Sequence, residues 1–151
     1  MMKLAEALIE RADLQRRLEQ LKQRLRQNAQ YQEGEQPTED PNSLLNEYHQ
    51  ITLLLEQMVT KINMANHRIY LENGLLMVSA LAQRDRLKNE HAMLVELANA
   101  ATPTFDRYSR SEIKMLSAID VKELRKRIDH IAKQHRELDT QIQQANWLND
   151  L

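Results

Sequence analysis

The segment DRYSRSEIK, residues 106–114, concentrates side chains that could bind an anion: three bases, two acids, two serines and one tyrosine within nine residues. Guanidinium groups grip phosphate or carboxylate through paired hydrogen bonds, and a lysine adds a positive charge. The hydroxyl groups of the segment would orient the ligand. The residues of this predicted anion site are Arg107, Tyr108, Ser109, Arg110, Ser111 and Lys114.

A structural role explains the same segment, because arginines near the end of a helical bundle can hold a loop in place through salt bridges. The acids available to them include Glu72, Asp85 and Glu112. No glycine-rich phosphate loop accompanies the segment, which favours such a joint over an anion site. Asp85 follows Arg84 on a helix that otherwise faces a core. We expect Asp85 either to orient an arginine of the segment or to help fix the register of an interface.

The remaining polar side chains give weak signals for catalysis or metal binding. His91 and His135 fall on or near apolar helix faces and are candidate metal ligands, but zinc needs three or four ligands at close range. A hydrogen-bonded core histidine is the simpler interpretation. The sequence has no nucleophile motif and no pair of carboxylates suited to acid–base work. We therefore expect a protein that is not an enzyme and has no cofactor.

The bulk composition argues against several partners. The net charge is −1, which gives little electrostatic attraction for nucleic acid, although residues 107–127 hold seven bases and three acids. The chain has no cysteine, so disulfide and thiolate chemistry are absent. The N-terminal stretch has no secretory pattern, and no segment has the roughly 18 apolar residues of a membrane span. We expect a cytoplasmic protein that binds neither nucleic acid nor membranes.

Heptad stripes of apolar residues organise most of the chain. A mostly apolar stripe in steps of three and four residues begins at Leu4 and includes Leu14, Leu18 and Leu21, and Arg11 and Asn28 are its polar positions. The pair Asp40-Pro41 predicts an N-cap and a first helical residue. The fold class is mostly α, with long antiparallel helical hairpins or a coiled-coil bundle in a single domain, residues 1–151. The predicted helices cover about 3–30, 41–68, 77–101 and 120–148.

A small extended end, with short β structure, is predicted between these helices. Asn73-Gly74 lies between apolar runs and predicts a hairpin turn near 69–77, in which both turn residues would have positive φ. Apolar residues alternate in EIKMLSAID, which favours a short strand near 111–118, although a helical turn is the alternative. Asp120 with Glu123 indicates the start of the last helix.

Several phrases together resemble one known family. They are MKLAEALIERADLQ, QEGE, LENG before SALAQRD, DRYSRSEIK leading to IDVKELRK, and the closing ELDTQIQQANW. On these phrases the chain resembles the septicolysin-like family of small bacterial helical proteins of uncharacterised role. The resemblance implies a coiled-coil-rich oligomer, such as a hexamer or another multiple of a dimer.

The functional expectation is a non-enzymatic homo-oligomeric helical scaffold whose partner is a second copy of itself. A lone chain would leave part of its apolar helix stripes exposed, which favours self-association. One alternative is a membrane-acting, haemolysin-like protein, as the family label implies. Another is an oligomer that binds a small anion or a metal.

Overall fold

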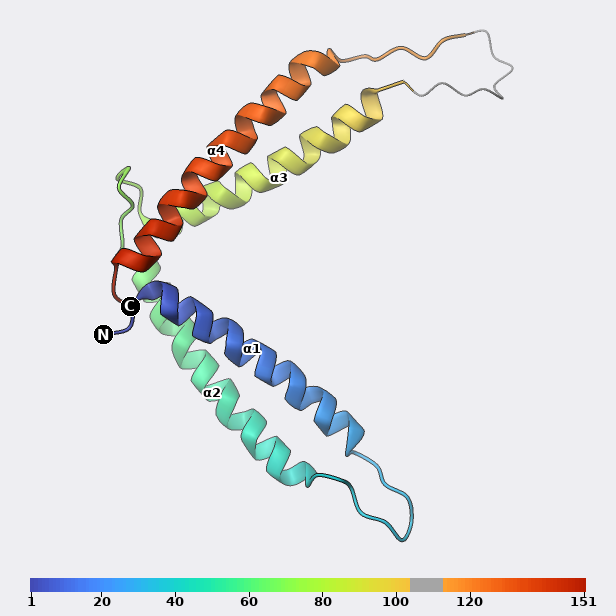
Figure 1. The fold of residues 1–151 in the computed structure, drawn as a ribbon, viewed down its shortest axis with the longest axis vertical. Coiled ribbons are helices and arrows are strands. Elements are labelled where there is room, and N and C mark those ends of the chain that lie inside the picture. Colours follow the sequence, from blue (N-terminus) through green and yellow to red (C-terminus); the bar gives the residue numbers. More distant parts are fainter. Residues whose placement is uncertain (104–112) are drawn as a thin grey trace. The chain divides into compact units, whose positions relative to one another are not determined.

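The computed structural model describes residues 1–103 and 113–151 and confirms a mostly α fold with four helices (Figure 1). The chain divides into two compact units, Met1–Tyr70 with Gln143–Leu151, and Leu71–Ile142. We call these unit 1 and unit 2; the prediction of a single domain stays a prediction. The helices are α1 (Leu4–Gln27), α2 (Pro41–Asn66), α3 (Met77–Ala101) and α4 (Val121–Leu148).

Unit 1 is built on α1 and α2, which lie side by side with the chain reversing direction between them (Figure 1). Their heptad stripes face each other and form an apolar core. α2 begins as predicted, because the carboxylate of Asp40 accepts a hydrogen bond from the Asn42 backbone N–H at 3.1 Å and Pro41 opens the helix. The core cluster consists of Leu14, Leu18, Leu21, Leu44 and Ile51, with Leu25, Tyr48, Leu55 and Met58 packed against it.

Asn28 ends α1 and holds the connection to α2. Its side-chain amide donates to the Arg24 carbonyl at 2.8 Å, and its side-chain oxygen accepts from the Glu39 backbone N–H at 2.9 Å. The Asn28 side chain is buried, and these two hydrogen bonds explain why a polar residue occupies this position of the stripe. Arg24 also binds Glu39, with the Arg24 Nε 3.0 Å from a Glu39 oxygen. The hydrogen bond from Arg24 lowers the pKa of the Glu39 carboxyl.

Unit 2 contains α3 and most of α4, joined by two ion pairs between the helices. Arg84 on α3 binds Asp139 on α4 at 2.8 Å, and Arg127 on α4 lies 3.6 Å from Glu90 on α3. Each helix buries an apolar stripe: Met77, Ala80, Leu87, Leu94 and Ala98 on α3, and Leu124, Ile128, Ile131, Leu138 and Ile142 on α4. The start of α4 matches the sequence prediction, since the Asp120 carboxylate accepts from the Glu123 N–H at 3.2 Å.

The turn before α3 is present, but its geometry differs from the prediction. Gly74 has a φ of +88°, whereas no residue other than glycine has a positive φ among the described residues, so Asn73 does not. The Gly74 N–H donates to the Leu71 carbonyl, the Leu71 N–H donates to the Leu75 carbonyl, and the Asn73 side chain accepts from the Leu75 N–H at 3.0 Å. The turn needs one left-handed glycine, with Asn73 acting through its side-chain oxygen.

The predicted short strand near 111–118 is not found in its described part. Residues 113–118 have no regular secondary structure, and no β-strand occurs in residues 1–103 and 113–151. The side chains that suggested alternation are exposed, as at Met115 (79%) and Leu116 (81%), so no buried face holds this segment as a strand. Residues 111 and 112 lie outside the described residues.

Candidate functional site

The predicted anion site or joint lies mostly outside the described residues. Arg107, Tyr108, Ser109, Arg110 and Ser111 belong to that part of the chain. Lys114 is described and exposed. Asp85 is also exposed, and it is Arg84 beside it that forms the ion pair to Asp139 on α4. Both the anion site and the structural joint therefore stay predictions. Next to Asp85, the ion pair that the structure shows is the one between Arg84 and Asp139.

The histidines named as weak metal candidates lie on different helices of unit 2. His91 on α3 and His135 on α4 are both partly buried. Among the described residues, no three side chains of histidine, cysteine, aspartate and glutamate are placed to hold a metal ion together. The described part of the chain thus offers these two side chains no third ligand.

A second heptad stripe runs along α2 beside its core stripe, about 100° around the helix, because each member comes one residue before a residue of the core stripe. We call it the α2 outer stripe, and every member is exposed. Its residues alternate in steps of four and three, so they lie along one line of the helix surface. The members are Ser43, Glu47, Gln50, Leu54, Gln57, Lys61, Met64 and Arg68, the last of which follows the helix end.

α2 is poor in charge for a helix with so much exposed surface. Among its 26 residues, Glu47, Glu56 and Lys61 are charged. The 24 residues of α1 include Glu6, Glu10, Arg11, Asp13, Arg16, Arg17, Glu19, Lys22, Arg24 and Arg26. α2 instead exposes large apolar side chains at Leu45 (53%), Leu53 (39%), Leu54 (51%) and Met64 (69%). Depletion of charge together with exposed leucine and methionine is typical of a surface that another protein covers.

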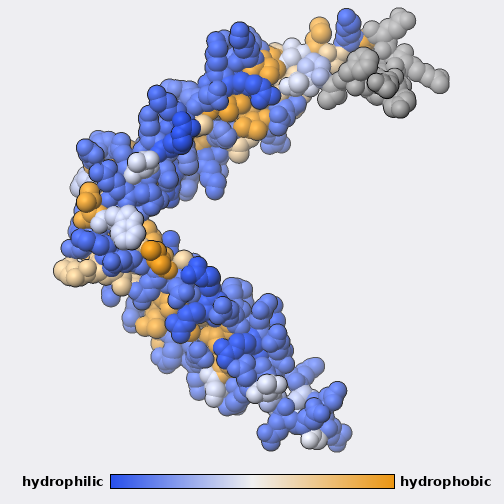
Figure 2. All heavy atoms as spheres, in the orientation of Figure 1, coloured by the Kyte–Doolittle hydropathy of each residue, from blue (hydrophilic) through white to orange (hydrophobic). Residues whose placement is uncertain are grey.

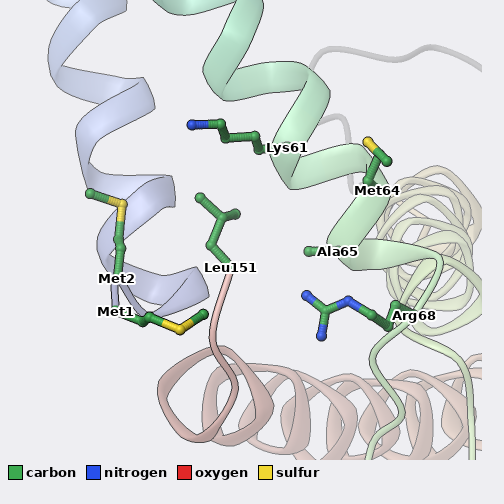
Figure 3. Close-up of a pocket in the computed structure, with 7 residues that line it drawn as sticks. All are labelled: Met1, Met2, Lys61, Met64, Ala65, Arg68 and Leu151. Atoms are coloured by element: carbon green, nitrogen blue, oxygen red, sulfur yellow. The ribbon is translucent and has the colours of Figure 1, made fainter.

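A hollow of about 410 Å³ adjoins the C-terminal end of the α2 outer stripe (Figure 3). Its walls combine apolar and cationic side chains. In Figure 3 the side chain of Leu151 lies between the N-terminal methionines and the residues of α2. The lining residues are Met1, Met2, Lys61, Met64, Ala65, Arg68 and Leu151. The stripe therefore ends in a surface that is both apolar and positively charged.

Backbone pairing between the two chain ends builds this surface. Leu4 N–H donates to the Asn149 carbonyl and Leu151 N–H donates to the Met2 carbonyl, both at 2.9 Å. Lys3 and Asp150 form an isolated antiparallel bridge, and their side chains form an ion pair at 2.9 Å. Hydrogen bonding and charge from Lys3 lower the pKa of the Asp150 carboxyl, with a smaller contribution from Arg68.

The Lys3–Asp150 ion pair should make the stability of the folded chain depend on pH. Because the folded state lowers the pKa of Asp150, its stabilising contribution is present above the pKa of the unfolded chain and is lost as pH falls through the folded pKa. We expect Asp150→Asn to lower the thermal unfolding midpoint slightly at pH 7, and to have no effect at a pH low enough to protonate Asp150 in both states. Thermal scans by circular dichroism at both pH values measure the difference. An equal deficit at the two pH values would contradict an ionic origin.

The α2 outer stripe was not among the sites predicted from the sequence. The signal is present in the sequence, since a second series of three- and four-residue steps begins at Ser43, one residue before the core stripe. On the face shown in Figure 2, apolar side chains lie among hydrophilic ones along each pair of helices. The sequence does not distinguish a second, exposed stripe from a widened core, whereas the exposure of each residue in the structure does.

The comparisons with known proteins correct the family resemblance. No curated protein matches the chain. A solved structure described as a functionally unknown conserved protein from Corynebacterium diphtheriae is 41% identical, with a TM-score of 0.93 over 99% of this chain and 98% of that chain. The septicolysin-like assignment was wrong, because the family model that matches residues 11–151 is a different one. The chain belongs to the family of unknown function DUF6847.

Proposed function

We propose that this protein is a non-enzymatic helical scaffold that works as a homo-oligomer. The observation that supports the proposal is the exposed, charge-poor surface of α2 outside its core stripe, where Leu45, Leu53, Leu54 and Met64 are exposed to water. Exposing such an apolar surface to water raises the free energy of a lone chain, and covering it with a partner lowers the free energy. We also propose that the paired helices are antiparallel coiled coils, in keeping with their strict heptad spacing.

The thinness of unit 1 adds a physical reason for self-association. α1 and α2 share one apolar core cluster, and α2 exposes further large apolar side chains outside it. An isolated pair of helices gains most of its stability from tertiary packing, and a second layer of helices would roughly double the faces that are covered. A homo-oligomer supplies such a layer without any other protein.

Sedimentation velocity on the purified full chain, over a range of micromolar concentrations, tests the proposal. We expect a species larger than the monomer, with native mass spectrometry giving a whole number of chains. A monomer at every concentration would overturn the proposal. Added mass from a metal or small molecule would favour the anion- or metal-binding alternative instead.

The membrane-acting alternative has lost its support. It rested on the name of a family to which the chain has proved not to belong. Among the described residues, none of the helices is both long and apolar enough to cross a bilayer. We therefore keep self-association as the proposed activity, with a second copy of the chain as the partner.

A further inference from the structure

Charges along the α2 outer stripe follow a self-complementary order. Steps of seven residues along the stripe give Glu47, Leu54, Lys61 and Arg68, and one further step back gives Asp40, the residue that caps α2. Two acids precede the central leucine, and two bases follow it. All five residues are exposed. A surface with this order of charges is repelled by a parallel copy of itself and attracted by an antiparallel one.

Helix geometry places Glu47, Leu54 and Lys61 in one row, whereas Asp40 and Arg68 lie just outside the two ends of α2. Seven residues make almost two turns of an α-helix, so successive members lie nearly above one another, about 10 Å apart at 1.5 Å per residue. The row turns slowly around the helix and lies beside Gln50, Gln57 and Met64 of the same stripe. Glutamine and methionine side chains adapt to a partner surface at low cost. The stripe is thus long, narrow and uncharged near its middle.

We propose that a second copy of the chain docks on the α2 outer stripe, with the two α2 helices antiparallel and a two-fold axis passing at Leu54. This inference rests on the proposed self-association and specifies its surface and register. Glu47 and Lys61 are equally far from Leu54, so each lies opposite the other residue of the second copy. Asp40 and Arg68 form a second such pair, farther out. Leu54 meets Leu54 of the second copy.

The inner charges of the stripe are available for such pairing. Neither Glu47 nor Lys61 forms an ion pair within the described residues. The pKa of Arg24 is raised mainly by its hydrogen bond to Glu39, and the charge of Glu47 adds a smaller contribution. The outer charges already have local contacts. Asp40 caps α2, and Arg68 donates to the Asp150 carbonyl at 3.1 Å. We therefore assign the specificity of the contact to Glu47 and Lys61.

A single cysteine at the centre of the stripe tests the register, because the natural chain has no cysteine. Facing helices lie about 8–10 Å apart, which brings Cα atoms on the touching sides within the reach of a disulfide. We expect Leu54→Cys to form a covalent dimer under mild oxidation of the full chain. Leu45→Cys is the matched control, since it lies nine residues earlier on the opposite side of α2 and has a similar exposure (53% against 51%). It should remain mostly uncrosslinked.

Charge reversal tests the pairing itself. Glu47→Lys and Lys61→Glu each place two pairs of like charges opposite one another in a dimer. The dissociation constant of each variant alone should therefore rise about tenfold or more. An equimolar mixture of the two variants restores both attractive pairs and should associate like the natural chain. The double variant should do the same. Circular dichroism on each variant confirms that its helices are intact.

The outcomes separate this inference from the proposal beneath it. Crosslinking through Leu54→Cys together with recovery in the mixture supports the register. An oligomer that crosslinks through Leu45→Cys instead, or that the reversals leave unchanged, overturns the register and leaves self-association standing. A natural chain that sediments as a monomer overturns both.

Discussion

Leu21→Ala is expected to lower the free energy of unfolding by about 2–5 kcal/mol, the range for deleting a buried leucine side chain. Leu21 is 2% exposed and belongs to the core cluster between α1 and α2. Its neighbours there include Leu18 on the same helix and Ile51 on α2. In a pair of helices, few other side chains lie close enough to fill the cavity that the substitution leaves. Urea unfolding followed by far-ultraviolet circular dichroism measures the loss.

Leu54→Ala is the control for this prediction, because it removes the same atoms from an exposed position. Leu54 is 51% exposed, so we expect its truncation to change unfolding by less than about 0.5 kcal/mol at concentrations where the protein is monomeric. The same substitution should weaken self-association. If Leu21→Ala proved as harmless as Leu54→Ala, the packing of α1 against α2 would not be what stabilises unit 1.

The helices were predictable from the sequence because their signals are local and repeated. Apolar residues at steps of three and four identified all four of them, and capping residues located two of the starts, at Asp40 and Asp120. The burial of Leu44, Ile51 and Ile62 follows the stripe that their spacing defines. Periodicity over many turns leaves little room for another secondary structure.

The non-helical segments were less predictable, because short patterns depend on what packs against them. Alternating apolar residues suggested a strand near 111–118, yet Met115 and Leu116 face solvent in the described part. At the turn, the pair Asn73-Gly74 correctly indicated a reversal, but the positive φ belongs to Gly74 and not to Asn73. A dipeptide specifies a turn without specifying the register of its hydrogen bonds.

Partners of individual charges were hidden from the sequence for a related reason. The sequence analysis singled out Asp85, whereas the ion pair at this point of α3 is formed by its neighbour Arg84. Its partner Asp139 lies on another helix, 55 residues along the chain. Which of the many acids on α4 comes level with Arg84 depends on the relative offset of two helices, and no local motif encodes that offset.

Replacing Asn28 by alanine is expected to cost about 1–3 kcal/mol, since it leaves the Glu39 N–H without its acceptor and removes the side-chain donor to the Arg24 carbonyl, which keeps the backbone N–H of residue 28. Asn28 is 5% exposed, so water cannot readily replace those bonds. Arg11→Ala is the matched control. Arg11 interrupts the same leucine stripe but is only partly buried and forms no hydrogen bond or ion pair in the described part of the chain. Its truncation should have a small effect, measured by the same urea unfolding.

Asn28→Leu distinguishes the two explanations for this polar residue. If Asn28 merely disturbed the apolar stripe, a leucine would complete the heptad and stabilise the chain. The hydrogen bonds indicate the opposite, because leucine can neither accept from the Glu39 N–H nor donate to the Arg24 carbonyl. We therefore expect Asn28→Leu to unfold at a lower urea concentration than the natural chain. A higher midpoint would show that the stripe, and not the connection between α1 and α2, determines the stability contributed at this position.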